Sequence, residues 1–202
     1  MKSTIYFSGV FMILGSLFSL CCCEKEQKAK QTEFTKADSL TESYLALKDS
    51  LLQTWNTMMH DYNRKIKAMQ HLLHELAISN PEKQEALNKY EHRLQNLANS
   101  RYDQNSISNT EVVTEYDFAS NSLVTELISL AESENEFAYN TTLQKLADEI
   151  RASDQRVNNY REDYDLIASE YNRFIVRNRL LLKEIDENPF QDTTPLFQMA
   201  AE

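Results

Sequence analysis

The residues of this chain that could hold a metal ion or transfer a proton are its histidines, two of which lie three positions apart beside a glutamate. His71, His74 and Glu75 fall in one run of helical periodicity, so their side chains lie on adjacent turns. The arrangements H-E-x-x-H and H-x-x-E-H of metal hydrolases are absent, as is the Glu-x-x-His of helical di-iron sites. We therefore expect surface histidines near a helix end, where the macrodipole favours positive charge. A metal or acid–base enzyme built on these three residues is the alternative.

Other catalytic motifs are missing from the sequence. Gly9 and Gly15 are its two glycines, so the chain has no glycine-rich loop for phosphate, and no serine lies in a G-x-S-x-G turn. The net charge of −10 makes nucleic acid an unsuitable partner, and we expect no polybasic contact with anionic lipid either. The chain is thus predicted to be no enzyme, to use no cofactor and to act by binding.

The first 23 residues have the composition of an export signal. A single lysine is their only charged residue, and an apolar run over residues 5–20 leads to three consecutive cysteines. This order is typical of a bacterial lipoprotein signal peptide, whose peptidase needs a small residue before the lipidated cysteine and a branched apolar residue three before it. Cys23 meets both conditions through Cys22 and Leu20, and Cys22 is the second choice. An uncleaved membrane helix is the alternative, since about 19 apolar residues are marginally enough to span a bilayer.

The longest helical pattern lies near the C-terminus, where residues 140–187 contain neither glycine nor proline. Counting from Leu143 in alternating steps of three and four predicts a heptad seam. Its members are Leu143, Leu146, Ile150, Ser153, Val157, Tyr160, Tyr164, Ile167, Tyr171, Phe174, Asn178, Leu181 and Ile185. A helix over 141–187 is expected, with a capping box formed by Thr141 and Gln144.

Apolar residues at helical spacing predict three earlier helices, over 36–78, 81–102 and 110–131. Pro81 separates the first two helices, because the residue before a proline does not readily stay helical. A polar stretch at 103–109 is rich in residues that favour turns and separates the second helix from the third.

Four helices of these lengths fit together most simply as an all-α, up-and-down four-helix bundle with two long antiparallel helices and a shorter helical hairpin. The hairpin is expected beside the halves of the long helices far from the tether, which leaves the near halves as a two-helix stalk. Antiparallel packing puts Tyr44 near Ile175 and Phe34 near Ile185. A three-helix arrangement with parallel long helices would put Tyr44 near Ile150 instead.

Regularly spaced residues of the last helix carry a family resemblance. They are Asp154, Arg156, Val157, Arg161, Tyr164, Asp165, Tyr171, Asn172 and Ile175. This pattern resembles the LemA family of bacterial membrane-attached helical proteins. Trp55 and Arg64 in the first helix also match that family's pattern, whereas Gln70 stands where the family has a proline. The resemblance implies a four-helix bundle facing away from the cytoplasm, and it implies no catalytic residue because the family has no agreed activity.

These observations predict a lipid-anchored, non-catalytic binding or scaffold module at the bacterial cell envelope, in the periplasm or at the cell surface. Its expected partners are the membrane, through the anchor, and an envelope protein; tethering raises the effective concentration near membrane partners. A carrier that holds a small apolar ligand among Tyr160, Tyr164 and Tyr171 is a further alternative. The predicted segments are a signal peptide with the lipidated cysteine at 1–23, a tether at 24–35, a LemA-like helical bundle at 36–187 and a C-terminal tail at 188–202.

Overall fold

The computed structural model describes residues 35–185 and 193–197 of the chain. Contacts between residues divide the chain after Phe34 into two units, and the described residues all belong to the second. The predicted signal peptide with Cys22 and Cys23, the tether up to Phe34 and most of the C-terminal tail lie outside the described residues. The expected contact between Phe34 and Ile185 lies outside them as well.

The described residues form an all-α unit without a strand. Its elements are the helices α2 (Lys36–Ser79), α3 (Gln84–Asn99), α4 (Thr110–Glu132) and α5 (Thr141–Ile185), with a 3₁₀ turn η1 (Pro81–Lys83) between α2 and α3. The predicted set of two long and two short helices is confirmed. The second helix was expected to run to residue 102 but ends at Asn99. It ends early because Tyr102 and Ile107 leave helical geometry and bury their side chains in the core.

Side-chain caps determine where the long helices begin. Thr35 was predicted to belong to the tether, but it is the N-cap of α2 and forms a capping box with Asp38. The capping box predicted from Thr141 and Gln144 is not formed. Asn140 Oδ1 instead accepts the amides of the second and third residues of α5, at 3.0 and 3.1 Å. The Gln144 side chain donates to main-chain carbonyls of the preceding turn.

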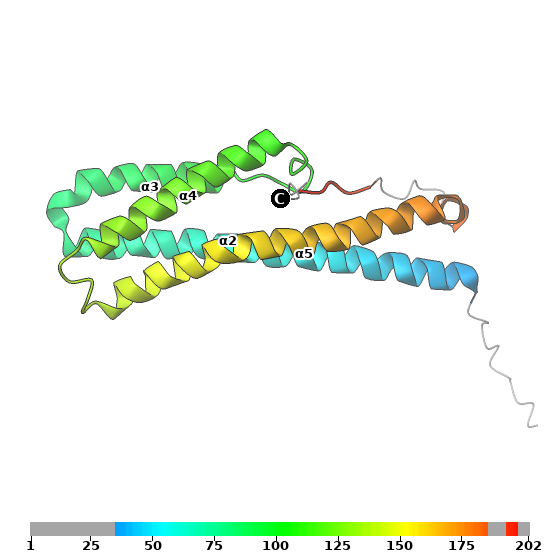
Figure 1. The fold of residues 1–202 in the computed structure, drawn as a ribbon, viewed down its shortest axis with the longest axis horizontal. Coiled ribbons are helices and arrows are strands. Elements are labelled where there is room, and N and C mark those ends of the chain that lie inside the picture. Colours follow the sequence, from blue (N-terminus) through cyan, green and yellow to red (C-terminus); the bar gives the residue numbers. More distant parts are fainter. Residues whose placement is uncertain (1–34, 186–192, 198–202) are drawn as a thin grey trace, which may run out of the picture. The chain divides into compact units, whose positions relative to one another are not determined.

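The two long helices are antiparallel, because the numbers of their contacting residues run in opposite directions. The ring of Trp55 on α2 lies 5.5 Å from that of Tyr164 on α5. Earlier along α2, the ring of Tyr44 lies 6.1 Å from that of Tyr171, which is later along α5 and one turn from the expected Ile175. The three-helix arrangement with parallel long helices is therefore excluded (Figure 1).

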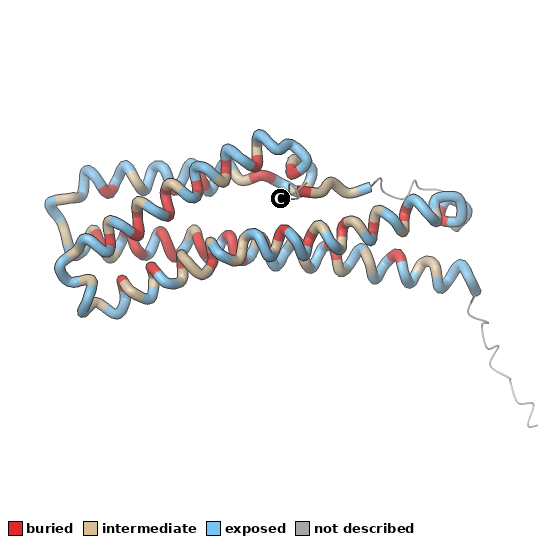
Figure 2. Tube along the Cα trace, in the orientation of Figure 1, coloured by how far each residue is buried: buried red, intermediate tan, exposed pale blue. Residues whose placement is uncertain are grey.

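Helices α3 and α4 form a hairpin beside the end of α2 and the start of α5, as predicted (Figure 1). The start of α2 and the end of α5 continue beyond the hairpin as a two-helix stalk. Figure 2 shows buried residues along the inner faces of the helices, and the described ones form one cluster between Tyr44 and Phe197. The bundle thus closes its own core. In the part of the chain that the structure describes, no helix is long and apolar enough to span a membrane.

The buried face of α5 differs from the predicted seam at several positions. Six predicted members are only half-buried and one is exposed; these are Leu146, Val157, Tyr160, Ile167, Phe174, Asn178 and Leu181. At five of these places the buried side chain lies one residue later along the helix; the five are Ala147, Arg161, Ala168, Ile175 and Leu182. Two of these are alanines, whose small side chains allow the helices to approach, and one is charged. A prediction that counts large apolar residues therefore places the seam at the neighbours of these buried residues.

Candidate functional site

Most of the residues that carry the family resemblance lie in polar contacts inside the bundle. These are Asp154, Arg156, Arg161, Tyr164 and Asn172. Trp55 and Tyr171 take part in ring contacts between α2 and α5. Arg64 differs from the rest, because its side chain is about half exposed and pairs with Glu149 at 3.1 Å.

Arg161 is the residue that connects most parts of the fold. Its Nη1 and Nη2 donate to the two carboxylate oxygens of Asp117 on α4, both at 2.7 Å. Nη2 also donates to the hydroxyl groups of Tyr62 and Tyr102, at 3.1 and 2.9 Å. The guanidinium carbon lies 5.1 Å from the centre of the Phe197 ring. One buried side chain of α5 thereby joins α2, α4, the loop after α3 and the C-terminal segment.

This environment suppresses acid–base chemistry. Burial alone would lower the pKa of Arg161, but its hydrogen bonds with Asp117 and the nearby phenol and carboxylate groups outweigh that effect and raise the pKa. Burial raises the pKa of Tyr62, Tyr102 and Tyr116 above the usual value for tyrosine. At neutral pH the arginine keeps its proton and the phenols keep theirs, so none of them can serve as a general base. The network stabilises the bundle.

Two further ion pairs join α2 to α5 along the same seam. Lys65 is only 2% exposed, and its Nζ donates to Asp154 Oδ1 at 3.0 Å and to Ser120 Oγ at 2.9 Å. Arg156 Nη2 donates to Asp61 Oδ1 at 2.6 Å. Each buried charge has an opposite charge within hydrogen-bonding distance, which such burial requires. The charges of these four residues are therefore paired with one another within the fold.

Residues 193–197, which we call the C-terminal strap, lie along α5. Asn172 binds both main-chain groups of Thr194: its Oδ1 accepts the amide at 2.7 Å and its Nδ2 donates to the carbonyl at 2.9 Å. Asp165 Oδ1 accepts the amide of Phe197 at 2.9 Å, and burial raises the pKa of Asp165. The Phe197 ring is buried. This part of the predicted tail is irregular, as expected, but it is an integral part of the bundle.

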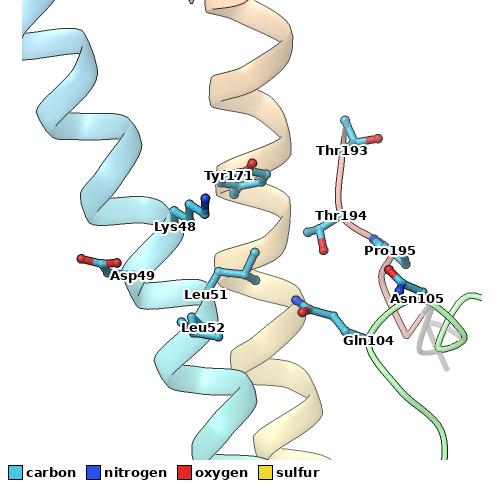
Figure 3. Close-up of a pocket in the computed structure, with 10 residues that line it drawn as sticks. All are labelled: Lys48, Asp49, Leu51, Leu52, Gln104, Asn105, Tyr171, Thr193, Thr194 and Pro195. Carbon is cyan, nitrogen blue, oxygen red and sulfur yellow. The ribbon is translucent and has the colours of Figure 1, made fainter. Parts of the chain in front are cut away.

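The strap forms one side of a cleft of about 450 Å³, a volume in the range of small ligand sites (Figure 3). The lining residues are Lys48, Asp49, Leu51, Leu52, Gln104, Asn105, Tyr171, Thr193, Thr194 and Pro195. In Figure 3 the α2 side chains lie on one side of the cleft, and the strap and the loop after α3 lie on the other. Opposite charges, amides and apolar groups thus meet in one hollow.

The residues of the two alternative hypotheses lie elsewhere. His71 and His74 are exposed on α2 and Glu75 is half-buried. The described residues contain no group of three or more histidine, cysteine or acidic side chains that could hold a metal ion. Tyr164 is fully buried against neighbouring rings. It therefore fills the interior in which the carrier hypothesis would place a ligand.

Sequence reasoning missed the partners of these residues. Asp61, Asp117 and Asn105 were not singled out, and the packing of the strap against α5 was not expected. Asp61 and Lys65 lie four residues apart on an otherwise apolar face of α2, and that signal could have indicated a buried pair. Nothing in the polar loop distinguishes Asn105 from its neighbours.

Comparison with known proteins identifies no relative, because no protein-family model, characterised protein or solved structure matches the chain. The resemblance to the LemA family stays a prediction. The function has to be inferred from the residues of the chain itself.

Proposed function

We propose that this chain is a lipid-anchored, extracytoplasmic binding module of the bacterial envelope, and that the cleft between α2 and the strap receives a protein partner. The observation that carries the proposal is the cleft itself. The buried charges of the bundle are paired with one another, whereas polar groups from α2, the loop and the strap converge on this hollow. Membership of the LemA family is part of the same proposal.

The lining of the cleft suits an extended segment of polypeptide. The amides of Gln104 and Asn105 can donate and accept hydrogen bonds, which matches the pairing needs of a peptide main chain. Lys48 and Asp49 offer both signs of charge to side chains of the partner. Leu52, 53% exposed, offers an apolar contact. We therefore expect a few residues of the partner to enter the cleft while the rest stays outside.

Site-specific photo-crosslinking in intact cells tests this proposal. A photoreactive amino acid replaces Leu52 in the cleft or, as a control, Ile78, which is similarly exposed but does not line the cleft. In a second part of the experiment, the bulky substitution Thr193→Trp fills the cleft. Its control is Thr125→Trp, at an exposed position of α4. We expect a discrete protein adduct from Leu52 and none from Ile78. Thr193→Trp should abolish the adduct and Thr125→Trp should keep it.

Two results would contradict the proposal. Equal adducts from Leu52 and Ile78 would show that the crosslinks report exposure alone. An adduct from Leu52 that survives Thr193→Trp would show that the partner does not occupy the cleft. Circular dichroism of each variant checks that the substitution leaves the helices intact.

A further inference from the structure

The last three turns of α5 present a face whose charge is opposite to that of the chain as a whole. Between Tyr171 and Lys183 the sequence has four basic residues and no acidic one, although the net charge of the chain is −10. The four are Arg173, Arg177, Arg179 and Lys183, and all are exposed. The total charge hides this local excess, which the expectation of no polybasic contact with anionic lipid did not take into account.

Apolar side chains lie between these cations on the outer side of the helix. Val176 and Leu180 are 66% and 79% exposed. At 3.6 residues per turn, Arg173, Val176, Arg177, Leu180 and Lys183 share one side of α5, which we call the basic face. An exposed helix face that combines cations with large apolar groups is typical of helices that lie in the interface of a membrane.

The basic face is not neutralised by the rest of the bundle. The buried residues of the same stretch, Tyr171 and Ile175, point to the opposite side, where Tyr171 meets α2. Within the described residues none of the four cations forms an ion pair; Arg173 Nε only donates to the carbonyl of Ser169, at 3.3 Å. Two exposed acidic residues of α5, Glu170 and Glu184, lie on the same side of the helix, so the stretch from Glu170 to Glu184 has a net charge of +2.

We propose that the basic face of α5 binds an anionic lipid surface. The inference rests on the proposed location at the envelope. The face lies at the stalk end of the bundle, where α2 begins (Figure 1). A second copy of the chain is a poor occupant, because a symmetric contact would bring the same cations against one another. The arginine and lysine groups bind lipid phosphates, while Val176 and Leu180 enter the boundary between headgroups and acyl chains.

Vesicle binding of the chain from residue 24 onward tests the proposal without any lipid anchor. This form keeps the whole described core, which begins at Tyr44. The probes are vesicles of phosphatidylglycerol and, for comparison, of phosphatidylcholine, and binding is measured by co-sedimentation. Because a basic residue near an anionic surface contributes about 1 kcal/mol, the triple change R173Q/R177Q/K183Q should weaken binding to phosphatidylglycerol on the order of 100-fold.

Matched controls separate this face from general effects of charge. The change K67Q/K89Q/K145Q removes three exposed cations outside the basic face, and we expect binding to stay within about threefold, since surface charges act over a Debye length. Leu180→Ser should weaken binding about tenfold, in line with the removal of a partly inserted leucine. Ile78→Ser, an equivalent change elsewhere on the surface, should leave it unchanged.

Several outcomes would overturn the inference. Equal binding to the two lipids, or equal weakening by the two triple changes, would show that the basic face does not recognise negative charge. A protein that forms dimers through this face in sedimentation experiments and ignores vesicles would show that a second copy is the occupant. Failure of lipidation at Cys23 would refute the proposed anchor and leave the vesicle result standing, so the two proposals can fail separately.

Discussion

Substituting Arg161 and Asp117, singly and together, would measure what an ion pair contributes inside this bundle. Asp117→Ala leaves the guanidinium, whose side chain is 6% exposed, without its two 2.7 Å partners. Breaking a buried pair from one side costs about 3–5 kcal/mol. The Asp117 side chain is 32% exposed, so water can partly replace it, and we expect a loss of about 3 kcal/mol in the free energy of unfolding.

The reverse change, Arg161→Met, leaves a carboxylate that water can reach and two tyrosine hydroxyls that still bond to each other. We expect a loss of about 2 kcal/mol, because the remaining groups are easier to satisfy. The double variant removes both charges and should lose little more than the worse single variant. The coupling energy of the cycle should therefore be about 2 kcal/mol.

Arg93 and Glu126 provide the matched control. They form the same two-point contact, at 2.6 and 2.8 Å, but their side chains are 42% and 39% exposed. An exposed pair contributes at most about 1 kcal/mol. Urea unfolding followed by the helical circular dichroism signal gives both coupling energies. If the coupling between Arg161 and Asp117 does not exceed that between Arg93 and Glu126, burial is not the source of the effect and the reasoning fails.

Three further predictions concern the strap, acid stability and the anchor. Asn172→Ala should accelerate hydrogen exchange in the strap and leave α3 unchanged, because two hydrogen bonds worth about 1 kcal/mol each are lost. Hydrogen bonds with Arg93 hold the pKa of Glu126 at about 2, so its stabilisation is complete above the ordinary value of 4.5 and is lost as the pH falls toward 2. Urea unfolding of Glu126→Gln should show a smaller loss over that range than the parent chain. Cys23→Ser should abolish labelling with palmitate and release the protein from membranes, whereas Cys22→Ser should do neither.

Much of the fold could be predicted from periodicity because the chain has so few places to turn. Both ends of α2 and α4 and the start of α5 lie within two residues of the prediction. The predicted seam of α5 differs from the buried face because burial depends on how two helices pack, whereas the prediction was based on large apolar side chains. Ala147 and Ala168 are fully buried beside larger neighbours. An alanine carries too little hydrophobic signal to reveal which side of the helix faces its partner.

The cleft could not be predicted at all. Its walls come from four separate segments of the chain, which are α2, the loop after α3, α5 and the strap, and its shape depends on the strap. Phe197 holds the strap by entering the core, 5.7 Å from the ring of Tyr102. The apolar pair Leu196-Phe197 in a polar terminus was a usable signal for such docking. The hydrogen bonds of Asn172 to Thr194 had no equivalent signal, since an exposed asparagine on a helix gives the same pattern.

The charged residues determine the relative direction and register of α2 and α5, which the apolar seam alone does not determine. In the antiparallel arrangement Lys65 meets Asp154 and Arg156 meets Asp61. Sliding α5 by one heptad, about 10 Å, would separate both pairs and leave the buried Lys65 and Asp61 without these partners. A parallel pair in the alternative register would place Lys65 beside Tyr171. Each unpaired buried charge costs several kcal/mol, whereas apolar contacts tolerate such shifts at a smaller cost. We infer that the ion pairs act chiefly by excluding these alternatives, while the apolar contacts supply most of the stability.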